Sequence, residues 1–242
     1  MAVIAVYSVK GGVGKSTLAA ALAWSSATVS RRHTLLWDLD VQGAAAFLTG
    51  HERPHGKQAA SIFSRETAPA DLVRHTRWDR LDLLPADDSL REIDSLFARI
   101  GKKRRLARMT EALSRDYERI ILDCPPVLNS LSDQVIRAAD LIVVPLPPSP
   151  LSRRALTAIR DELVRNHKKH PPILPVLSMV DMRRTLHREA VAEANGWPVI
   201  PMSTHLEQMA TRREPIGAFA PSSPAAQAMA RVWTGIERKL CS

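Results

Sequence analysis

The stretch that decides the fold is Val9-Lys10-Gly11-Gly12-Val13-Gly14-Lys15-Ser16-Thr17, close to the N-terminus. An apolar run at residues 3–7 precedes it and predicts a buried strand, and an alanine-rich run at residues 18–24 follows it and predicts a helix. A glycine-rich turn between a strand and a helix is the context of a phosphate-binding loop. Glycines let successive backbone N–H groups turn toward phosphate oxygens, and the helix directs the positive end of its dipole at the same oxygens.

Two side chains of this loop carry the expected chemistry. Lys15 is placed to bind β- and γ-phosphates, and the hydroxyl of Ser16 is placed to ligate Mg²⁺. The usual pattern asks for a glycine five residues before Gly14, but Val9 stands there and a second lysine, Lys10, follows it. This arrangement resembles the deviant Walker A loop of the ParA/MinD family of ATPases, whose extra lysine reaches the ATP of a partner subunit.

The resemblance implies a set of nucleotide-binding residues in which Lys10 and Lys15 also act in catalysis. The set is Lys10, Gly11, Gly12, Val13, Gly14, Lys15, Ser16 and Thr17.

A second signal lies where the run at residues 33–37, a predicted strand, ends in Asp38 and Asp40. Open α/β sheets bind ligands at the carboxyl ends of their strands. Residues 35–43 resemble the family motif Asp-x-Asp-Pro-Gln-Gly, with Val41 in place of the proline. By this resemblance Asp40 positions or activates the attacking water, and Asp38 supports Mg²⁺ through water. The alternative is a pair of carboxylates that caps the next helix.

A third signal is the apolar run at residues 119–122, which ends in Asp123 and reads as a Walker B strand. Asp123 is expected in the Mg²⁺ shell, so the predicted metal ligands are Ser16, Asp38 and Asp123. Pro125 and Pro126 end the strand. In the family that the chain resembles, this loop senses the γ-phosphate.

Apolar strand-like runs alternate with longer helical segments along the rest of the chain, which predicts an α/β fold. We expect a mostly parallel twisted sheet with helices on both faces, of the P-loop NTPase (deviant Walker A) type, in a single domain over residues 1–242. Helices are expected at residues 70–75, 90–100 and 131–139, among others. The resemblance places the strand ends at 178–181 and 201–204 near the adenine base.

The chain of 242 residues has a formal net charge of +9, which favours a polyanionic partner. Aromatic residues make up only 5%, so phosphate contacts without base stacking fit better than sequence readout. ParA-type proteins use dispersed basic residues of the C-terminal half to bind DNA. The corresponding candidates are Arg183, Arg184, Arg188, Arg212 and Arg213.

Alternatives remain open for these charges. The candidate arginines could instead pair with Glu189, Glu193, Glu207 and Glu214 at the surface. The basic run at residues 101–108 is either a DNA contact or a solvated helix start. A basic surface also serves solubility alone.

The resemblance implies a homodimer that forms on binding ATP and Mg²⁺, binds DNA non-specifically, and is released by slow hydrolysis. A ParB-like or adaptor protein would stimulate hydrolysis, and the cycle would serve plasmid or chromosome partition or cargo positioning. The alternative is an ATPase that regulates a membrane-associated, secretion or polysaccharide assembly without binding DNA.

Several further classes are disfavoured. No apolar run approaches 18 residues, so we expect no transmembrane helix and no stable membrane insertion. Two cysteines without metal-ligand spacing or a disulfide framework favour a reducing cytoplasm, and DNA binding would make the protein nucleoid-associated. We expect no signal peptide. The tail at residues 235–242 is shorter and less apolar than a MinD-type membrane anchor. Cys124 and Cys241 do not resemble the cluster ligands of a nitrogenase-reductase-like electron carrier.

Overall fold

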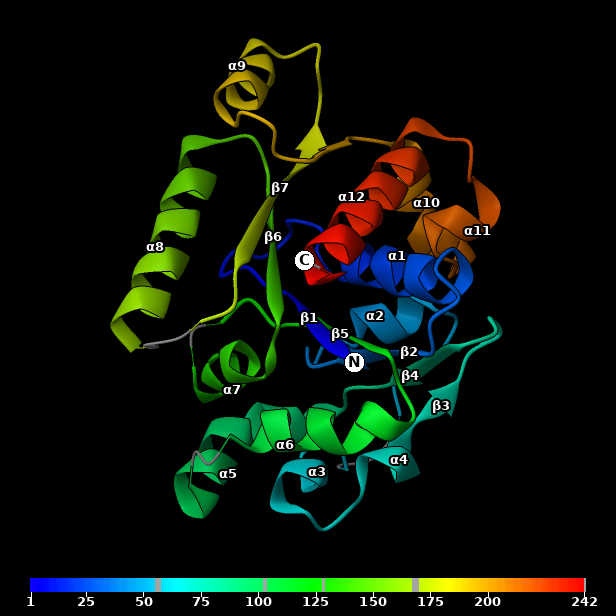
Figure 1. Ribbon diagram of the computed structural model, residues 1–242, viewed down its shortest axis with the longest axis vertical. Coiled ribbons are helices and arrows are strands. Elements are labelled where there is room, and N and C mark those ends of the chain that lie inside the picture. Colours follow the sequence, from blue (N-terminus) through cyan, green and yellow to red (C-terminus); the bar gives the residue numbers. More distant parts are fainter. Residues whose placement is uncertain (55–57, 102–103, 128, 167–169, 242) are drawn as a thin grey trace.

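A central sheet of eight strands organises the chain in this computed structural model, which describes residues 1–54, 58–101, 104–127, 129–166 and 170–241 (Figure 1). The strand order is β3-β4-β2-β5-β1-β6-β7-β8. Neighbouring strands run parallel except for the antiparallel pair β3 and β4. The strands are β1 (Ala2–Val6), β2 (Thr34–Asp38), β3 (Arg74–His75), β4 (Leu81–Leu84), β5 (Arg119–Asp123), β6 (Leu141–Leu146), β7 (Ile173–Val180) and β8 (Val199–Pro201).

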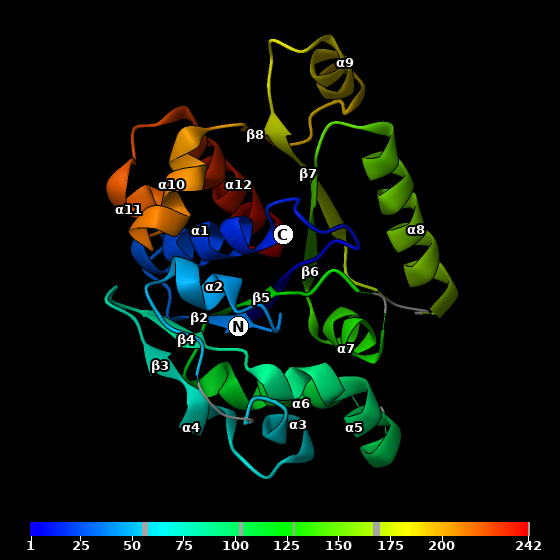
Figure 2. The ribbon, with the colours of Figure 1, turned by 180° about the vertical axis from the view of Figure 1, so that it is seen from behind.

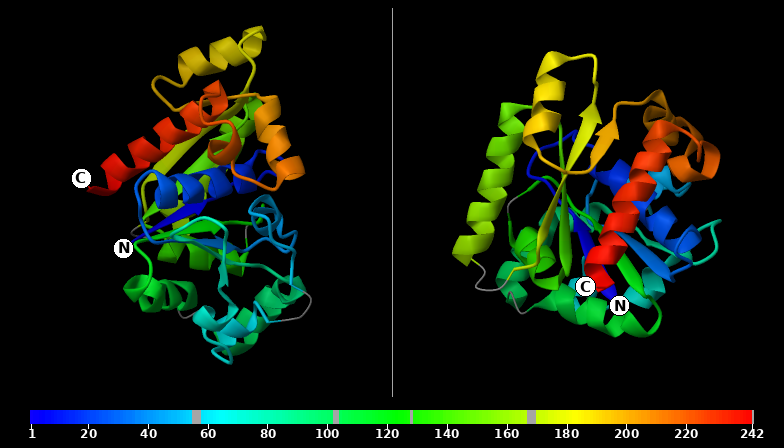
Figure 3. Two further views of the ribbon diagram at one scale, coloured as in Figure 1. Left: turned by 90° about the vertical axis from the view of Figure 1, so that its right-hand side faces the viewer. Right: turned by 45° about the horizontal axis from the view of Figure 1, so that its top comes forward.

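Helices cover both faces of the sheet, as the left panel of Figure 3 shows. One layer contains α1 (Lys15–Thr28), α2 (Ala44–Leu48), α10 (Thr204–Arg212), α11 (Ile216–Phe219) and α12 (Pro224–Cys241). The other contains α3 (Ser61–Ser64), α4 (Pro69–Leu72), α5 (Ile93–Ile100), α6 (Arg105–Ala112), α7 (Ser130–Ala138) and α8 (Pro150–Asn166). Helix α9 (Thr185–Glu193) lies beyond the end of β7 (Figure 2). The predicted fold class is confirmed.

The central strands are buried on both faces, which is why their sequences are almost uninterruptedly apolar. In β1, Val3 and Ala5 belong to the core under α5 to α8, whereas Ile4 and Val6 belong to the core under α1 and α12. Side chains alternate between faces along a strand, so each central strand contributes to both cores. Because β2, β5 and β1 are parallel neighbours, their carboxyl ends meet at one edge of the sheet.

Two local predictions were wrong. Residues 70–75 do not form one helix, because α4 ends at Leu72 and the next residues pair with β4, Arg74 opposite Leu83. Residues 90–100 are not one helix either, because a 3₁₀ turn, η1 (Asp88–Glu92), precedes α5. In both places long-range pairing or a local cap overrides the helical spacing that the sequence shows.

The basic run at residues 101–108 includes the start of a helix. Lys102 and Lys103 lie outside the described residues, and Arg105 is the first residue of α6. The Arg105 guanidinium donates to the carbonyls of Phe63 at 2.9 Å and Ile100 at 2.7 Å. Arg105 therefore holds α6 against its neighbours. A second short 3₁₀ turn, η2 (Leu113–Arg115), follows α6.

Within the described residues, no helix combines the length and the apolar character needed to cross a bilayer.

Helices α1 and α11 touch through a glycine, which generates a stability prediction. A Cβ on Gly217 would lie 2.1 Å from Cζ3 of Trp24, so Gly217→Ala forces the indole or α11 to move. We expect the free energy of unfolding to fall by about 1–3 kcal/mol. Chemical denaturation of the purified protein measures this change.

Gly235→Ala is the matched control, because Gly235 lies in α12 and no atom lies within 4 Å of its added Cβ. Its unfolding free energy should stay the same or rise by about 0.5–1 kcal/mol, since alanine favours a helix interior. Equal stability of Gly217→Ala and wild type would contradict the close contact.

Candidate nucleotide-binding site

The glycine loop between β1 and α1 has the backbone that the sequence predicts. Gly12 and Gly14 have φ angles of 69° and 87°, a left-handed region that side chains rarely adopt. Gly14 is the N-cap of α1, yet no side chain caps this helix and its first turn carries no acidic residue. The first N–H groups of α1 therefore remain available, and they point along a dipole that favours an anion.

The two lysines of the loop differ in their surroundings. Lys15 is buried, with 7% of its surface exposed, and its Nζ donates to the Lys10 carbonyl at 3.2 Å. Burial lowers the pKa of the Lys15 ammonium, and the carboxylates of Asp123 and Asp40 oppose this shift. The Lys10 side chain is exposed. The Lys15 side chain is thus enclosed within its own loop, whereas the Lys10 side chain is accessible to solvent.

Asp38 and Asp123 lie side by side at the carboxyl ends of β2 and β5, where they pair in register. Both are fully buried. The Asp38 carboxylate accepts N–H bonds from Asp40 at 3.1 Å and Ala46 at 3.2 Å. Burial and the neighbouring Asp123 raise the pKa of Asp38. Asp38 therefore holds the turn after β2 and the start of α2, as the helix-capping alternative requires.

The Asp123 carboxylate differs from that of Asp38 in its hydrogen bonding. Among the described residues, no donor meets either of its carboxylate oxygens with hydrogen-bond geometry. Burial raises the pKa of Asp123 to about 7, although the nearby Ser16 hydroxyl and Lys15 lower it. A buried polar group without a partner usually marks a missing ion or ligand. Carboxylate and hydroxyl oxygens are the ligands that Mg²⁺ prefers, so Ser16 and Asp123 fit this ion.

Asp40 begins a tight turn and is half-buried, and its charge acts on Lys15 and Asp123. Its carboxylate accepts the Gln42 N–H at 3.0 Å, and its carbonyl accepts the Gly43 N–H at 2.9 Å. The pKa values of Lys15 and Asp123 both respond to the Asp40 charge. Asp40 therefore lies close to the predicted phosphate and metal groups.

Sequence reasoning missed the residue that holds this turn from outside. Arg53 donates to the Val41 carbonyl at 2.8 Å, binds Asp88 with two N–H groups at 3.1 Å, and packs against Gly43. Val41 stands where the family motif has proline, and the Arg53 contact fixes the carbonyl of this residue. No sequence pattern points to Arg53, which lies in a polar segment.

A cavity of about 300 Å³ adjoins the glycine loop. Its wall is mostly apolar and includes the two strand ends expected near a base. The lining residues include Val13, Gly14, Thr17, Leu18, Ser178, Met179, Met202, Ser203, Leu206, Glu207 and Met229. Of these, Leu18, Leu206, Glu207 and Met229 were not predicted, since they lie outside the motifs that the sequence shows.

Strand β7 contacts the glycine loop directly through an irregular end. The strand bulges between Leu177 and Val180, and Met179 has a φ of 57°, which is rare for a residue with a side chain. The Ser178 hydroxyl donates to the Val13 carbonyl at 3.1 Å. The Met179 methyl carbon lies 3.7 Å from the Cβ position of Gly14. Backbone strain of this kind concentrates at functional sites.

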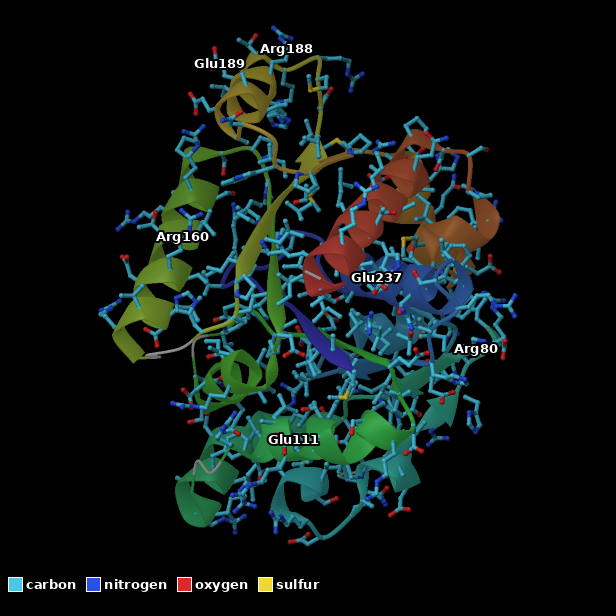
Figure 4. The ribbon with its side chains drawn as sticks, viewed as in Figure 1. Arg80, Glu111, Arg160, Arg188, Glu189 and Glu237 are labelled. Atoms are coloured by element: carbon cyan, nitrogen blue, oxygen red, sulfur yellow. The ribbon has the colours of Figure 1, made fainter. Side chains whose placement is uncertain are left out.

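The five DNA-binding candidates fall into two groups. Arg183, Arg184 and Arg188 surround the start of α9, at one end of the molecule, where Figure 4 shows Arg188. Arg212 and Arg213 lie at the end of α10. The structure therefore does not bring all five into one cluster within a single chain.

Most of these arginines have partners within the chain. Arg183 binds Asp181 at 2.9 Å, and Arg188 donates to the Met182 and Arg183 carbonyls. Figure 4 places Arg188 and its neighbour Glu189 on the outer side of α9. Glu193, one of the partners considered in the alternative of surface pairing, pairs with Arg153 and not with a candidate arginine.

The second group is also engaged. Arg212 stacks over Phe219 at 4.9 Å and Arg213 over Phe47 at 4.7 Å. Arg213 also binds Glu52 at 2.7 Å. Glu214, another partner considered in that alternative, pairs with Arg77 at 2.8 Å.

Three comparisons with known proteins bear on this site. The AAA domain family model (AAA_31) matches residues 1–174. The sporulation initiation inhibitor protein Soj of Bacillus subtilis (strain 168) is 29% identical over 238 residues, which cover 93% of this chain and 94% of Soj. The chromosome partitioning protein ParA of Myxococcus xanthus (strain DK1622) is 28% identical over 228 residues, which cover 88% of this chain and 80% of ParA.

A solved structure also matches this chain over the whole of its sequence. Cobyrinic acid a,c-diamide synthase from Mycobacterium smegmatis, with bound ATP analogue and magnesium, superimposes with a TM-score of 0.82 at 25% identity. The match covers 100% of this chain and 96% of the other.

The uncapped helix behind the glycine loop and the Walker B aspartate in a parallel sheet define a P-loop NTPase. The family model covers residues 1–174, and the similarity to Soj and ParA agrees with the geometry of the site. The chain therefore belongs to the ParA/MinD family of deviant Walker A ATPases.

The buried Asp123 carboxyl generates a prediction about pH. Its pKa is about 7 in the folded chain and near 3.8 ordinarily, so the folded state holds a proton that the unfolded state has lost. Stability of the nucleotide-free protein should therefore fall as pH rises from about 4 to about 7. Asp123→Asn should flatten this fall and raise the melting temperature at pH 8, because it removes a buried unpaired charge.

Thermal unfolding without Mg²⁺ across pH 4–8 measures both effects. Asp79→Asn is the control, because the Asp79 side chain is 89% exposed, and it should follow wild type. An Asp123→Asn curve that also follows wild type would show that the carboxyl titrates normally.

Proposed function

We propose that this chain hydrolyses ATP and dimerises when ATP and Mg²⁺ bind. The observation that carries the proposal is the pair of loop lysines, one buried in its own site and the other exposed beside it. The triphosphate lies along residues 11–17, with Lys15 on the β- and γ-phosphates and the α1 N–H groups behind them. The adenine base occupies the cavity lined by Met179 and Met202.

In this proposal Ser16 and Asp123 would hold Mg²⁺, and Asp38 would support the ion through water. The ion neutralises phosphate charge when it is bound. The buried, unpaired carboxylate of Asp123 supports this role. Asp38 contributes mainly by fixing the turn that carries Asp40, because its oxygens already accept two backbone N–H bonds.

Asp40 positions the attacking water. Its carboxylate lies near Lys15 and Asp123, and the turn of residues 40–43 together with Arg53 keeps it there. Phosphoryl transfer needs positioning and charge stabilisation more than covalent chemistry, which these fixed groups provide. Hydrolysis by Asp40 alone is slow, and a ParB-like or adaptor protein accelerates it.

Lys10 acts across the dimer. Its side chain is exposed and its ammonium is carried by the loop that grips the phosphates, so a second copy facing this edge of the sheet would receive it. An ammonium buried against a partner's phosphates gains strongly from charge-assisted bonds. ATP binding and dimer formation are thereby coupled.

The dimer binds DNA non-specifically in this proposal. The net charge of +9 supports attraction to phosphate, and the similarity to Soj and ParA supports a role in partition or positioning in the cytoplasm, on the nucleoid. Arg183, Arg184 and Arg188 form the stronger candidate group, because all three are exposed and lie within six residues at the start of α9.

One observation favours a second function. Four of the five candidate arginines are already engaged within the chain, which weakens a dedicated DNA surface. An ATPase that regulates a membrane-associated, secretion or polysaccharide assembly needs the same nucleotide site and no DNA contact.

Removal of the exposed lysine tests the coupling. Lys10→Ala should remain monomeric with ATP and Mg²⁺, because the partner's phosphates lose their second ammonium. Asp40→Ala should accumulate as the dimer, because hydrolysis no longer dissolves it. Light scattering after size-exclusion chromatography measures both masses.

Arg231→Ala is the control for loss of one positive charge, since Arg231 is an exposed residue of α12, and it should dimerise like wild type. A Lys10→Ala dimer of normal stability would remove the role given to Lys10.

DNA binding separates the two candidate functions. Fluorescence anisotropy with a random-sequence duplex should show binding that ATP and Mg²⁺ strengthen and that salt weakens. ATP-dependent dimerisation without any DNA binding at low salt would instead favour the assembly-regulating function.

A further inference from the structure

Tyr7 connects two segments of the site that lie far apart in the sequence. It directly follows β1 and is 2% exposed. Its hydroxyl donates to the Val127 carbonyl at 2.9 Å, a contact across 120 residues. Its backbone N–H donates to the Val143 carbonyl of β6 at 3.0 Å. One residue is thus bonded to β6 by its backbone and to the segment after β5 by its side chain.

The segment that Tyr7 holds is the post-β5 loop, residues 124–127, which follows Asp123. Within the part of the chain that the structure describes, the backbone of this loop makes few other hydrogen bonds. Pro125 and Pro126 have no N–H to donate, and the Val127 N–H closes a tight turn onto the Pro125 carbonyl at 2.9 Å. Cys124 donates its N–H to Val6 at 3.3 Å. The Tyr7 hydroxyl therefore bonds the sheet to Val127, the last residue of this loop.

The start of α7, which follows this loop in the sequence, is also fixed by hydrogen bonds. Asn129 caps α7 and donates from its side chain to Asp94 at 2.9 Å, and Ser130 donates its N–H to the same carboxylate at 3.0 Å. Val127 lies between the end of β5 and this helix cap, and the Tyr7 hydroxyl binds its carbonyl. Val127 itself is 36% exposed.

Tyr7 is suited to hold and not to react. Burial raises the pKa of its phenol, and a hydrogen bond with Ser132 lowers it only in part. The hydroxyl therefore remains protonated and remains a donor at physiological pH. Nothing in the chemistry described for the site uses this group.

We propose that Tyr7 is a positioning residue that couples the post-β5 loop to the phosphate-binding loop. The covalent path is short, because Ser8 and Val9 are all that separates Tyr7 from Lys10, and the Ser8 hydroxyl accepts the Lys10 N–H at 3.3 Å. Displacement of the post-β5 loop by a γ-phosphate would therefore act on Tyr7 and, through it, on Lys10. This role rests on the proposed nucleotide-binding function.

The chain supplies a matched control, because it contains only two tyrosines. Tyr117 is 9% exposed and donates its hydroxyl to Asp82 at 2.8 Å, and burial raises its pKa as well. Tyr117 precedes β5, whereas Tyr7 follows β1 and binds the loop after β5. The two tyrosines therefore lie at opposite ends of these parallel strands. Tyr7→Phe and Tyr117→Phe each remove one hydroxyl oxygen and the hydrogen bond that this hydroxyl donates.

Hydrogen–deuterium exchange tests the positioning directly. In Tyr7→Phe the amides of peptide 122–131 should exchange roughly twofold to tenfold faster, the factor expected from the loss of one hydrogen bond. Tyr117→Phe should leave this peptide unchanged. Equal exchange in Tyr7→Phe and wild type, or the same increase in both variants, would overturn the proposal.

Nucleotide measurements test the coupling. Tyr7→Phe should bind ATP within about twofold of wild type, while its ATP-dependent dimerisation and kcat fall roughly threefold to tenfold with an unchanged KM. A weaker ATP affinity with normal dimerisation would overturn coupling and indicate a structural role. If wild type itself fails to bind ATP, the proposed function fails, and the exchange experiment still decides the positioning.

A spectroscopic measurement covers the case in which Tyr7→Phe does not fold. In the Tyr117→Phe protein labelled with 3-fluorotyrosine, the single ¹⁹F resonance reports Tyr7 alone. Addition of a non-hydrolysable ATP analogue with Mg²⁺ should shift this resonance, and ADP should shift it less. An identical spectrum in all three states would overturn the proposed connection.

Discussion

The constraint on which the site depends is the parallel pairing of β2 with β5, which sets two buried aspartates opposite each other. Asp38 and Asp123 occupy one register position at the carboxyl ends of these strands. Two carboxyls out of water repel and resist ionisation, so the fold must compensate. Backbone N–H groups compensate Asp38, and Ser16 and Lys15 approach Asp123. The glycine loop, the turn after β2 and the post-β5 loop are arranged around this pair.

Local patterns predicted the parts of the structure that local chemistry determines. The glycine loop could be predicted from the sequence because only glycine adopts the φ angles of Gly12 and Gly14 without strain. The positions of β1, β5 and β6 could be predicted because these strands are buried on both faces, which requires mostly apolar sequences. Asp38 and Asp123 follow from those strand ends, so the core of the candidate site could be predicted before any coordinates.

The remaining features depend on contacts between distant segments. Arg53 reaches Val41 and Asp88, and Ser178 reaches Val13, yet each is an ordinary residue in its own segment. The left-handed backbone of Met179 is not predictable from a β-strand pattern, because methionine does not ordinarily adopt it. The ion pairs and aromatic contacts of the candidate arginines could not be predicted for the same reason. The partner of a charged side chain depends on which distant segments the fold brings next to it.

The short strand β3 limits how copies of this chain can add to one another. It closes one edge of the sheet with two residues, Arg74 and His75, both exposed and running against β4. A long apolar edge strand offers a template for continuous sheets between molecules, whereas a brief polar one offers almost none. The protein is thereby protected from stacking into fibrils on that side, even at high local concentration.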